Sequence, residues 1–269
     1  MERISRFGQV KVYVGKCFRA FKNERGWKML ISAGIIAIII SWVAGDDMFL
    51  TYSATRSGAF ALVCACIWTG IFNSIQSICR ERAIIKRENR TGLHISSYIV
   101  AHMIYEMVLS FIQAFITTVI VVIMRHPPTN GIFTLVFTEL LITFFLVIFA
   151  ADVLGMLVSC IAKNETAAMT AMPFVLILQL VMSGIIFELQ GAASFVSNLT
   201  ISKWGVNAIC SISNVNMMLD ALFAPNFDRS QYTFLTSHLA QLWMILIVFT
   251  LIYGILAVFS LKMVSKDKR

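Results

Sequence analysis

The chain has 269 residues, of which 58% are apolar and 13% charged, and its mean hydropathy is +0.81. Soluble domains carry about 25% charged residues, so an ordinary soluble domain is excluded and lipid is the expected solvent. The net charge of +8 does not indicate nucleic-acid binding, because the basic residues follow the membrane-orientation pattern described below. The six cysteines show no CxxC or Cys/His ligand spacing, so neither a disulfide nor a metal site is expected.

The first 28 residues are charged and contain no cleavable signal, so the first apolar run is expected to remain in the membrane. Within them, apolar side chains recur at helical spacing, with Lys16 and Arg19 on the opposite side. These apolar residues are Phe7, Val10, Val14, Cys17, Phe18 and Phe21. The pattern predicts an amphipathic helix in the cytoplasmic membrane interface, either as an anchor or also as a contact for a cytoplasmic partner.

Six stretches follow that are long enough to cross about 30 Å of hydrocarbon, which takes ~20 helical residues. They cover residues 29–45, 57–78, 95–124, 131–162, 167–187 and 237–261. Pro127 and Pro128 break the helix between the third and fourth stretches, and Pro173 predicts a kink in the fifth. No internal repeat of the kind found in many secondary transporters is visible. The predicted fold class is an all-α polytopic membrane protein with six transmembrane helices.

The distribution of Lys and Arg predicts the orientation. With a cytoplasmic N-terminus, eighteen of them fall on the inner side and four on the outer side. Cytoplasmic loops carry the excess of basic residues in membrane proteins. Both termini, including a basic tail at 263–269, and the loop between the second and third spans are therefore expected in the cytoplasm.

That loop, "CRERAIIKRENRTGLHISSY" from Cys79 to Tyr98, holds five basic and two acidic residues. It could be a spacer, a patch for lipid headgroups or a docking element. The run "ERAIIKREN" favours a short helix that ends at Thr91-Gly92. Ile84 and Ile85 form an apolar ridge among charges of both signs, which a spacer does not need and a uniformly basic lipid patch would lack. Mixed charge around an apolar ridge is typical of an element that docks into a protein groove.

Three stretches carry a family pattern. The first has the form ER…RE…G…SxY…E and consists of Glu81, Arg82, Arg87, Glu88, Gly92, Ser97, Tyr98 and Glu106. The second, 159–189, contains a small-residue turn, a proline and a Ser-Gly before an apolar pair, and the third is "ISKWGVNAI". Together they resemble the membrane domains of ABC exporters of the White/G subfamily and their bacterial relatives, in order and over nearly the whole chain.

The resemblance implies that residues 80–92 form a cytoplasmic coupling helix, which docks into a separate ATP-hydrolysing subunit. The docking residues that it implies are Glu81, Arg82, Ile84, Ile85, Arg87, Glu88 and Gly92. It also implies a homo- or heterodimer of permease chains in the lipid bilayer. The second and fifth spans of each chain would line a central cavity between the two copies.

The same resemblance implies the lining of that cavity. The cavity residues that it implies are Trp68, Thr69, Phe72, Ile177 and Leu180. Ile185 and Ile186 match the apolar pair that closes the cavity toward the outside. Thr69 stands where relatives often have an aromatic residue, so an aromatic clamp is not implied. For each of these residues, contact with lipid or packing between helices is an equally good reading.

Residues 29–262 form the transmembrane domain in this interpretation, and 188–236 form its external segment between the fifth and sixth spans. That segment is too apolar for a solvated loop and too interrupted to span the membrane. A re-entrant segment fits, provided that protein covers its broken backbone.

Three carboxylates, Glu106, Glu139 and Asp152, fall within the apolar spans, where a charge at the bilayer centre costs roughly 2.5–3.5 kcal/mol or more. They are interpreted as hydrogen-bonded or ion-paired struts in preference to a proton or cation relay. Glu106 could pair with arginines of the charged loop. His102 and Glu106 stand four residues apart, a spacing that can hold a metal, but a third ligand is lacking and no metal is expected.

No ATP-binding loop, HExxH or GxSxG motif occurs, so the chain is not expected to be an enzyme or to bind a cofactor. ATP and Mg²⁺ would bind to a partner ATPase. The resemblance therefore implies the permease subunit of a prokaryotic ATP-driven exporter in the cell membrane, and an apolar, aromatic cavity favours lipid-like or drug-like cargo. The alternatives are an ATP-independent channel or secondary transporter that relies on Glu139 and Asp152, and an intramembrane enzyme.

Overall fold

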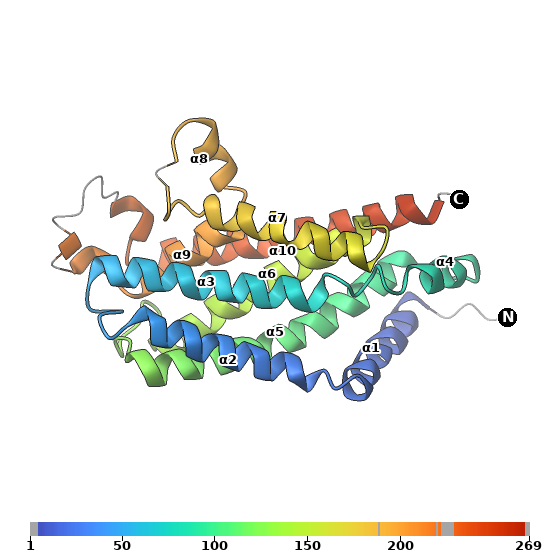
Figure 1. Ribbon diagram of the computed structural model, residues 1–269, viewed down its shortest axis with the longest axis horizontal. Helices are drawn as coiled ribbons and strands as arrows, with labels where there is room; N and C mark the ends of the chain where they lie inside the picture. Colours follow the sequence, from blue (N-terminus) through green and yellow to red (C-terminus); the bar gives the residue numbers. More distant parts are fainter. Residues whose placement is uncertain (1–4, 188, 219, 222–228, 267–269) are drawn as a thin grey trace.

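The computed structural model describes residues 5–187, 189–218, 220–221 and 229–266, and within these residues every regular element is a helix (Figure 1). Five helices are long and apolar enough to cross a membrane. They are α2 (Trp27–Ala44), α3 (Tyr52–Ser74), α5 (Ile95–Arg125), α6 (Val136–Ile161) and α10 (Thr236–Lys266). The predicted all-α class is confirmed. The expected fifth span is the 17-residue apolar helix α7 (Glu165–Val181), which is shorter than the 167–187 prediction.

The bundle is built around α6, which packs against α3, α5, α10 and the short helix α9 (Ile201–Ile212). Its side chains Leu140, Phe144 and Ile148 are fully buried. Glycine brings α6 close to α3, because a Cβ atom on Gly70 would lie 2.5 Å from the main-chain oxygen of Ile148. Helices that associate in membranes often have small residues at their contacts. Close packing of the backbones then stabilises the pair, because the hydrophobic effect does not drive helices together in lipid.

The helix ends differ in how well hydropathy predicts them. The third span agrees almost to the residue, 95–124 against Ile95–Arg125, because His126 adopts a left-handed conformation just before the two prolines. In contrast, α3 begins five residues before the predicted 57. Its first turn is stabilised by the Asp220 carboxylate, which accepts hydrogen bonds from the main-chain nitrogens of Tyr52 and Ser53 at 2.7 and 3.3 Å.

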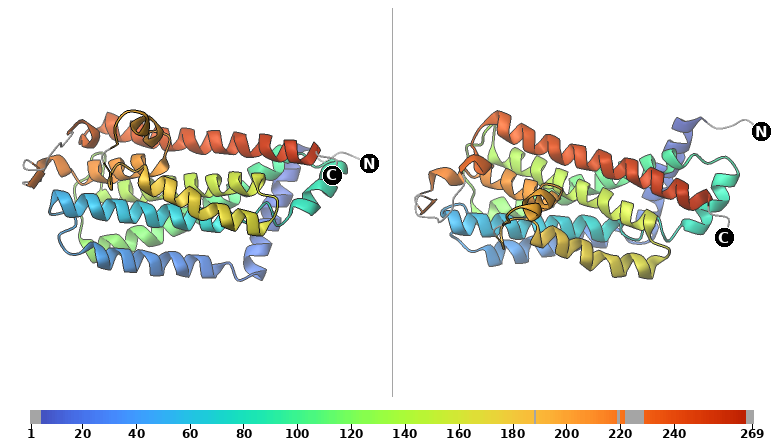
Figure 2. Two further views of the ribbon diagram at one scale, coloured as in Figure 1. Left: turned by 45° about the horizontal axis from the view of Figure 1, so that its top comes forward. Right: turned by 90° about the horizontal axis from the view of Figure 1, so that it is seen from above.

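Helix α1 (Arg6–Asn23) lies across one end of the bundle, beside the short helix α4 (Arg82–Arg90) (Figures 1 and 2). It packs against α5. The ring of Tyr13 meets that of Tyr98 edge to face at 5.4 Å, and Phe18 meets Tyr105 at 5.5 Å. Part of the predicted lipid-facing stripe therefore contacts protein, whereas Phe7 at its start is 89% exposed.

The segment after α7 contains α8 (Ala192–Ser197), α9, and the 3₁₀ turns η1 (Val215–Met217) and η3 (Arg229–Tyr232). Helix α8 projects from the bundle beside α7 (Figure 1). Helix α9 packs against α3, α6 and α10, and ten of its twelve residues are buried. Protein therefore covers α9, whereas α8 lies at the outside of the bundle. Of the predicted external segment, residues 188, 219 and 222–228 lie outside the described residues, as do 267–269 of the basic tail.

Candidate functional site

Helix α4 is a nine-residue helix with a defined stop. It ends at Arg90, and Gly92 follows with φ +114°, a conformation that glycine adopts at little cost. Arg87 and Arg90 occupy its last turn, where positive charge interacts favourably with the helix dipole. The predicted short helix and its stop at Thr91-Gly92 are confirmed.

Side chains of α1 hold α4 at both ends. Lys16 pairs with Glu81 at 2.8 Å, just before α4, and the Tyr13 hydroxyl donates to Glu88 at 2.6 Å. Beyond the helix, the Gln9 amide donates to the Gly92 carbonyl at 3.1 Å and accepts from the His94 main-chain nitrogen at 2.9 Å. These contacts link α1 to the charged loop from Glu81 to His94.

Glu81 is the junction of this network, because the Tyr98 hydroxyl also donates to it at 2.9 Å. Partial burial acts to raise the pKa of the Glu81 carboxyl, but the hydrogen bonds from Lys16 and Tyr98 and the charge of Lys16 outweigh it, so the pKa is lowered. Burial and the hydrogen bond to Glu88 raise the pKa of the Tyr13 hydroxyl. The contacts are therefore made by an ionised Glu81 and a neutral Tyr13.

The predicted apolar ridge is divided between two environments. Ile85 is 1% exposed and packs with Leu93, Ile95 and Tyr98 of its own chain, whereas Ile84 is 40% exposed. Consecutive residues on a helix point about 100° apart, so one short helix cannot present both to a partner while it also packs on its own chain. Ile85 is therefore buried within its own chain, and Ile84 is the member of the ridge that is exposed for a partner.

The other predicted docking residues also fall into two groups. Glu81 and Glu88 contact α1, and the guanidinium of Arg82 donates to the carbonyl of Ala162 at the end of α6. The exposed side of α4, which we call the α4 face, consists of Ala83, Ile84, Arg87 and Arg90, with Thr91 and Gly92 exposed at its end. Ala83, Arg90 and Thr91 were not predicted, although their three- and four-residue spacing from Ile84 and Arg87 was a signal for them.

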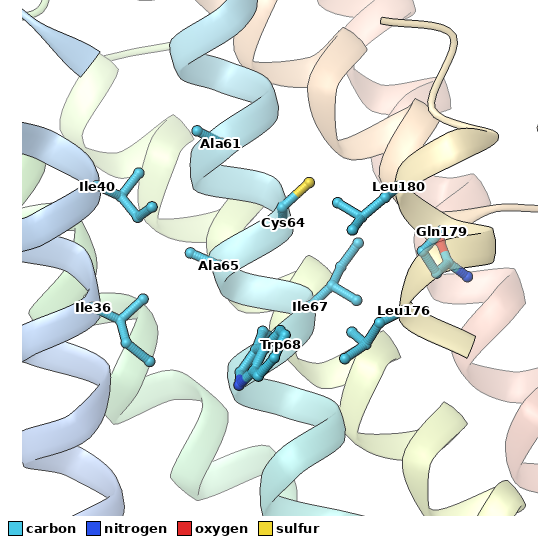
Figure 3. A pocket seen from close by; sticks show the side chains of 10 residues that line it. All are labelled: Ile36, Ile40, Ala61, Cys64, Ala65, Ile67, Trp68, Leu176, Gln179 and Leu180. Atoms are coloured by element: carbon cyan, nitrogen blue, oxygen red, sulfur yellow. The ribbon is translucent and has the colours of Figure 1, made fainter. Parts of the chain in front are cut away.

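A groove of about 500 Å³ lies between α2, α3 and α7. Figure 3 shows Cys64 and Trp68 of α3 between the isoleucines of α2 and the leucines of α7. The lining residues are Ile36, Ile40, Ala61, Cys64, Ala65, Ile67, Trp68, Leu176, Gln179 and Leu180. The surface is almost entirely apolar, so it suits lipid tails, an apolar molecule or another apolar helix.

Two of the five predicted cavity residues, Trp68 and Leu180, line this groove. Thr69 instead is 8% exposed and its hydroxyl donates to the Ala65 carbonyl at 2.8 Å, so within this chain it is a packing residue outside the groove. Phe72 lines a second cavity, and Ile177 is 54% exposed outside the groove. The contribution of α2 was missed, because its apolar residues carry no signal that separates a groove from lipid.

Gln179 ties the groove to α9. Its side-chain oxygen accepts from the main-chain nitrogens of Ile201 and Ser202 at 2.9 and 3.2 Å, which caps the first turn of α9. Beyond α7 the chain turns at Gly184, with φ +77°, and Arg56 donates to the Gly184 carbonyl at 3.0 Å. This turn ends α7 before the predicted position.

Ile185 and Ile186, the predicted outer gate, follow that turn. Ile185 packs on the core of the bundle, and Ile186 is 49% exposed. The two side chains therefore lie in different environments within this single chain.

The second cavity, which we call the α1 cavity, has a volume of about 390 Å³ and lies between α1, α3, α5 and α7. Glu106 and His102 of α5 line it together with Asn73 and Lys16. Glu106 is 2% exposed, and no ion pair joins it to an arginine among the described residues, contrary to the expected pairing. The described residues also contain no group of three metal ligands around His102.

Cys17 completes the wall of the α1 cavity beside His102, with its Sγ 3.8 Å from Nε2. Burial raises the pKa of the Cys17 thiol to about 12, and the charges of Glu81 and Glu106 act in the same direction. Cys17 is therefore a neutral thiol that fills space, not a reactive thiolate.

The other two carboxylates are both buried but differ in role. Glu139 lies in the first turn of α6, and one of its oxygens accepts from the main-chain nitrogens of Phe133 and Thr134 at 2.5 and 3.2 Å. It is thus a strut that orders the turn before α6. Asp152 is fully buried in the middle of α6 and contacts Ser110 of α5.

The chain matches a family model and a relative. The family model, described as "ABC-2 type transporter", matches residues 8–214. The chain is also 28% identical over 171 residues to the ABC transporter ATP-binding/permease protein Rv1747 of Mycobacterium tuberculosis. This match covers 62% of the chain and 20% of the relative, so the chain spans about a fifth of the length of that protein. The region that the family model matches includes α4, the groove and the α1 cavity.

Proposed function

Because the chain belongs to the ABC-2 type transporter family of membrane domains, and is thus a multi-pass ABC transporter permease, we propose that it is the permease subunit of an ATP-driven exporter. The chain contains no ATP-binding loop, so ATP and Mg²⁺ would bind to a partner ATPase. The chain itself would bind no cofactor. The observation that carries this proposal is α4, which is fixed to the bundle on one side and exposed on the other.

In this proposal the α4 face docks into the ATPase. Ile84 supplies an apolar contact, and Arg87 and Arg90 supply positive charge around it. The opposite side of α4 is engaged by Lys16 and Tyr13 of α1 and by the end of α6. A push on α4 by the closing ATPase would therefore reach α1, α5 and α6 as one movement, which is how the coupling would work.

The groove between α2, α3 and α7 would be one half of the transport pathway. Two copies of the permease, identical or different, would face each other across α3 and α7, with Trp68 and Leu180 on the cavity wall. The apolar lining supports lipid-like or drug-like cargo over a strongly charged one. Alternation of the cavity between inward-facing and outward-facing states, with Ile185 and Ile186 closing the outer end, would move the cargo.

The proposed topology has six spans, with α7 as a short fifth span. Both termini, α1 and α4 would be cytoplasmic, and α8 and α9 would lie on the outer side of a prokaryotic cell membrane. Support comes from the excess of Lys and Arg on the expected inner side. It also comes from the position of α1 and α4 at the end of the bundle opposite η1 and η3 (Figure 1).

Co-purification tests this proposal. The chain is extracted from its native membrane in a mild detergent, and the co-purifying proteins are identified by mass spectrometry, for the wild type and for Ile84→Asp. An ATPase subunit is expected with the wild type and is expected to be lost with Ile84→Asp. The matched control is Leu50→Asp, another exposed aliphatic side chain (71% exposed) at the opposite end of the bundle, which should retain the ATPase.

If no ATPase accompanies the wild type under conditions that keep other ABC complexes intact, the exporter proposal is wrong. Transport that continues without ATP and stops in Asp152→Asn would instead favour the ATP-independent channel or secondary transporter.

A further inference from the structure

The contact between α5 and α6 contains two buried acids that have no counter-ion in the part of the chain that the structure describes. Glu106 is 2% exposed and Asp152 is fully buried, and the two carboxyl groups interact electrostatically. One oxygen of each, Glu106 Oε2 and Asp152 Oδ1, has no hydrogen-bond partner among the described residues. A buried carboxylate without a partner is costly, and two that share a site do not both ionise.

Nearby cations are already engaged or exposed. Of the cations that line the α1 cavity, Lys16 pairs with Glu81 and Arg80 pairs with Glu24. Arg25 and Lys28 line the same cavity but are exposed to solvent. The remaining titratable groups on its wall are Cys17, His102 and Tyr105. None of these supplies a fixed positive charge to Glu106 or Asp152, so a mobile ligand is the remaining way to remove one negative charge.

The hydroxyl of Ser110 indicates which ligand this is. Its oxygen lies 2.6 Å from the main-chain carbonyl of Glu106 and 2.5 Å from Oδ2 of Asp152. A serine hydroxyl has one hydrogen to donate, and a carbonyl has none. When that hydrogen points to the carbonyl, the contact with Asp152 needs a hydrogen on the carboxyl group. A protonated Asp152 therefore satisfies both contacts, whereas an ionised Asp152 leaves two acceptors for one hydrogen.

Both acids are connected to the α1 cavity, which provides a route for the proton. Glu106 lines the α1 cavity directly. Asn73 lines the same cavity, lies close to Asp152 and donates to Gln113 at 2.9 Å. We propose that Glu106 and Asp152 form a site for one exchangeable proton, held on Asp152 against Ser110 and supplied through the α1 cavity. This inference is independent of the exporter proposal, because the site lies within one chain and needs neither ATP nor a partner.

The site also has a structural consequence. Asp152 follows Ala151, and both the Cβ of Ala151 and the main-chain nitrogen of Asp152 lie within 3.0 Å of the Cβ position of Gly70. The proton therefore neutralises an acid beside a close contact between α3 and α6. Its loss would place the negative charge of Asp152 beside that contact.

Infrared spectroscopy of the full-length chain in nanodiscs, without nucleotide or partner, tests the site. We expect a carbonyl stretching band from a protonated carboxyl group near neutral pH, which shifts when H₂O is replaced by D₂O. Asp152→Asn should lose this band, and Ser110→Ala should shift its frequency because the hydrogen bond is removed. Glu139→Gln is the matched control, since it alters a buried acid at the other end of α6, and should leave the band in place.

The proposal is overturned if the difference spectrum between the wild type and Asp152→Asn shows no band from a protonated carboxyl group. It is also overturned if that band does not shift in D₂O. A carboxylate signal that changes when Na⁺ replaces choline, with no acid band, would assign the site to a metal cation and overturn it too. Circular dichroism checks that each variant is folded. If Asp152→Asn does not fold, an unchanged band in Ser110→Ala overturns the proposal on its own.

Discussion

Glu81 joins three elements through a single carboxylate, since Lys16 of α1 and Tyr98 of α5 both bind it directly before α4. We expect Glu81→Gln to lower the free energy of unfolding by about 1 kcal/mol, because the pair is only partly shielded from solvent and Tyr98 keeps an acceptor. Glu24→Gln is the matched control, as its pair with Arg80 is more than half exposed and should contribute almost nothing. Thermal unfolding of the purified variants measures the difference, and equal effects would contradict it.

The contribution of Glu81 also has a defined pH dependence. The folded-state pKa of Glu81 is lowered relative to its ordinary value, so the stabilisation is present above the ordinary pKa and is lost as the pH falls through the lowered one. The wild type should therefore lose more stability than Glu81→Gln between neutral and acidic pH. Parallel melting curves for the two proteins over that range would contradict this assignment.

Glu139 acts through the backbone. Glu139→Ala would leave the main-chain nitrogens of Phe133 and Thr134 without their acceptor, at an expected cost of about 2 kcal/mol. Glu165→Ala is the control, because Glu165 is also an acid in the first turn of a helix but is exposed. Its loss should cost less than about 1 kcal/mol through the helix dipole alone. Comparison of the two melting temperatures checks this, and an equal or smaller loss in Glu139→Ala would refute the strut.

At the scale of elements, the contact between α3 and α6 depends on Gly70. A methyl group there would lie 2.5 Å from the Ile148 carbonyl oxygen, which belongs to the backbone and cannot rotate away. Gly70→Ala should therefore destabilise the chain by about 1–3 kcal/mol. Gly34→Ala in α2 should be neutral or stabilising by up to about 1 kcal/mol, because its added Cβ would find only ordinary contact, with Ile116 at 3.5 Å. Thermal stability in nanodiscs distinguishes the two, and a stable Gly70→Ala would show that the helices can separate at no cost.

The end of a helix could be predicted from sequence where charged residues or prolines directly follow its apolar run. The apolar run of α5 stops at Arg125 just before Pro127, so hydropathy finds its end within a residue. The run of α7 continues in sequence to Phe187, but its helix ends at Val181, where the Ser183 hydroxyl and a positive φ at Gly184 form a turn. Hydropathy does not register such a turn, because the residues that form it lie beside apolar ones.

The sequence predicts which segment forms the candidate site, but it does not predict which side chains of that segment are exposed. The segment 80–92 is recognisable from its charges and its glycine stop. Which of Ile84 and Ile85 is exposed depends on residues outside the helix, because Ile85 belongs to a buried cluster that includes Leu93 and Tyr98. Likewise, the groove needs α2 beside α3, a neighbour that residue spacing within α3 does not reveal. Contacts between distant segments are what the linear pattern lacks.

At the scale of the whole molecule, the end of the bundle that carries α1 and α4 is expected to face the cytoplasm. Arg87 of α4 and Phe195 of α8 are exposed. Helix α4 lies at the end of the bundle near α1, whereas α8 projects from the bundle beside α7 (Figure 1). In a Cys64→Ala background, an impermeant maleimide added to intact cells should label Phe195→Cys but label Arg87→Cys only after the cells are permeabilised. The other five native cysteines are buried and should give little background.

This orientation is expected because the basic residues are concentrated in segments on one side of the membrane. Eighteen of the 22 Lys and Arg residues fall in segments expected on the same side as α1 and α4, and translocating that charge outward would be opposed by the membrane potential. Labelling of Arg87→Cys in intact cells would reverse the orientation and move the α4 face out of reach of any cytoplasmic ATPase. Protection of Arg87 together with labelling of Phe195 instead leaves the α4 face on the only side of the membrane where ATP is available to drive it.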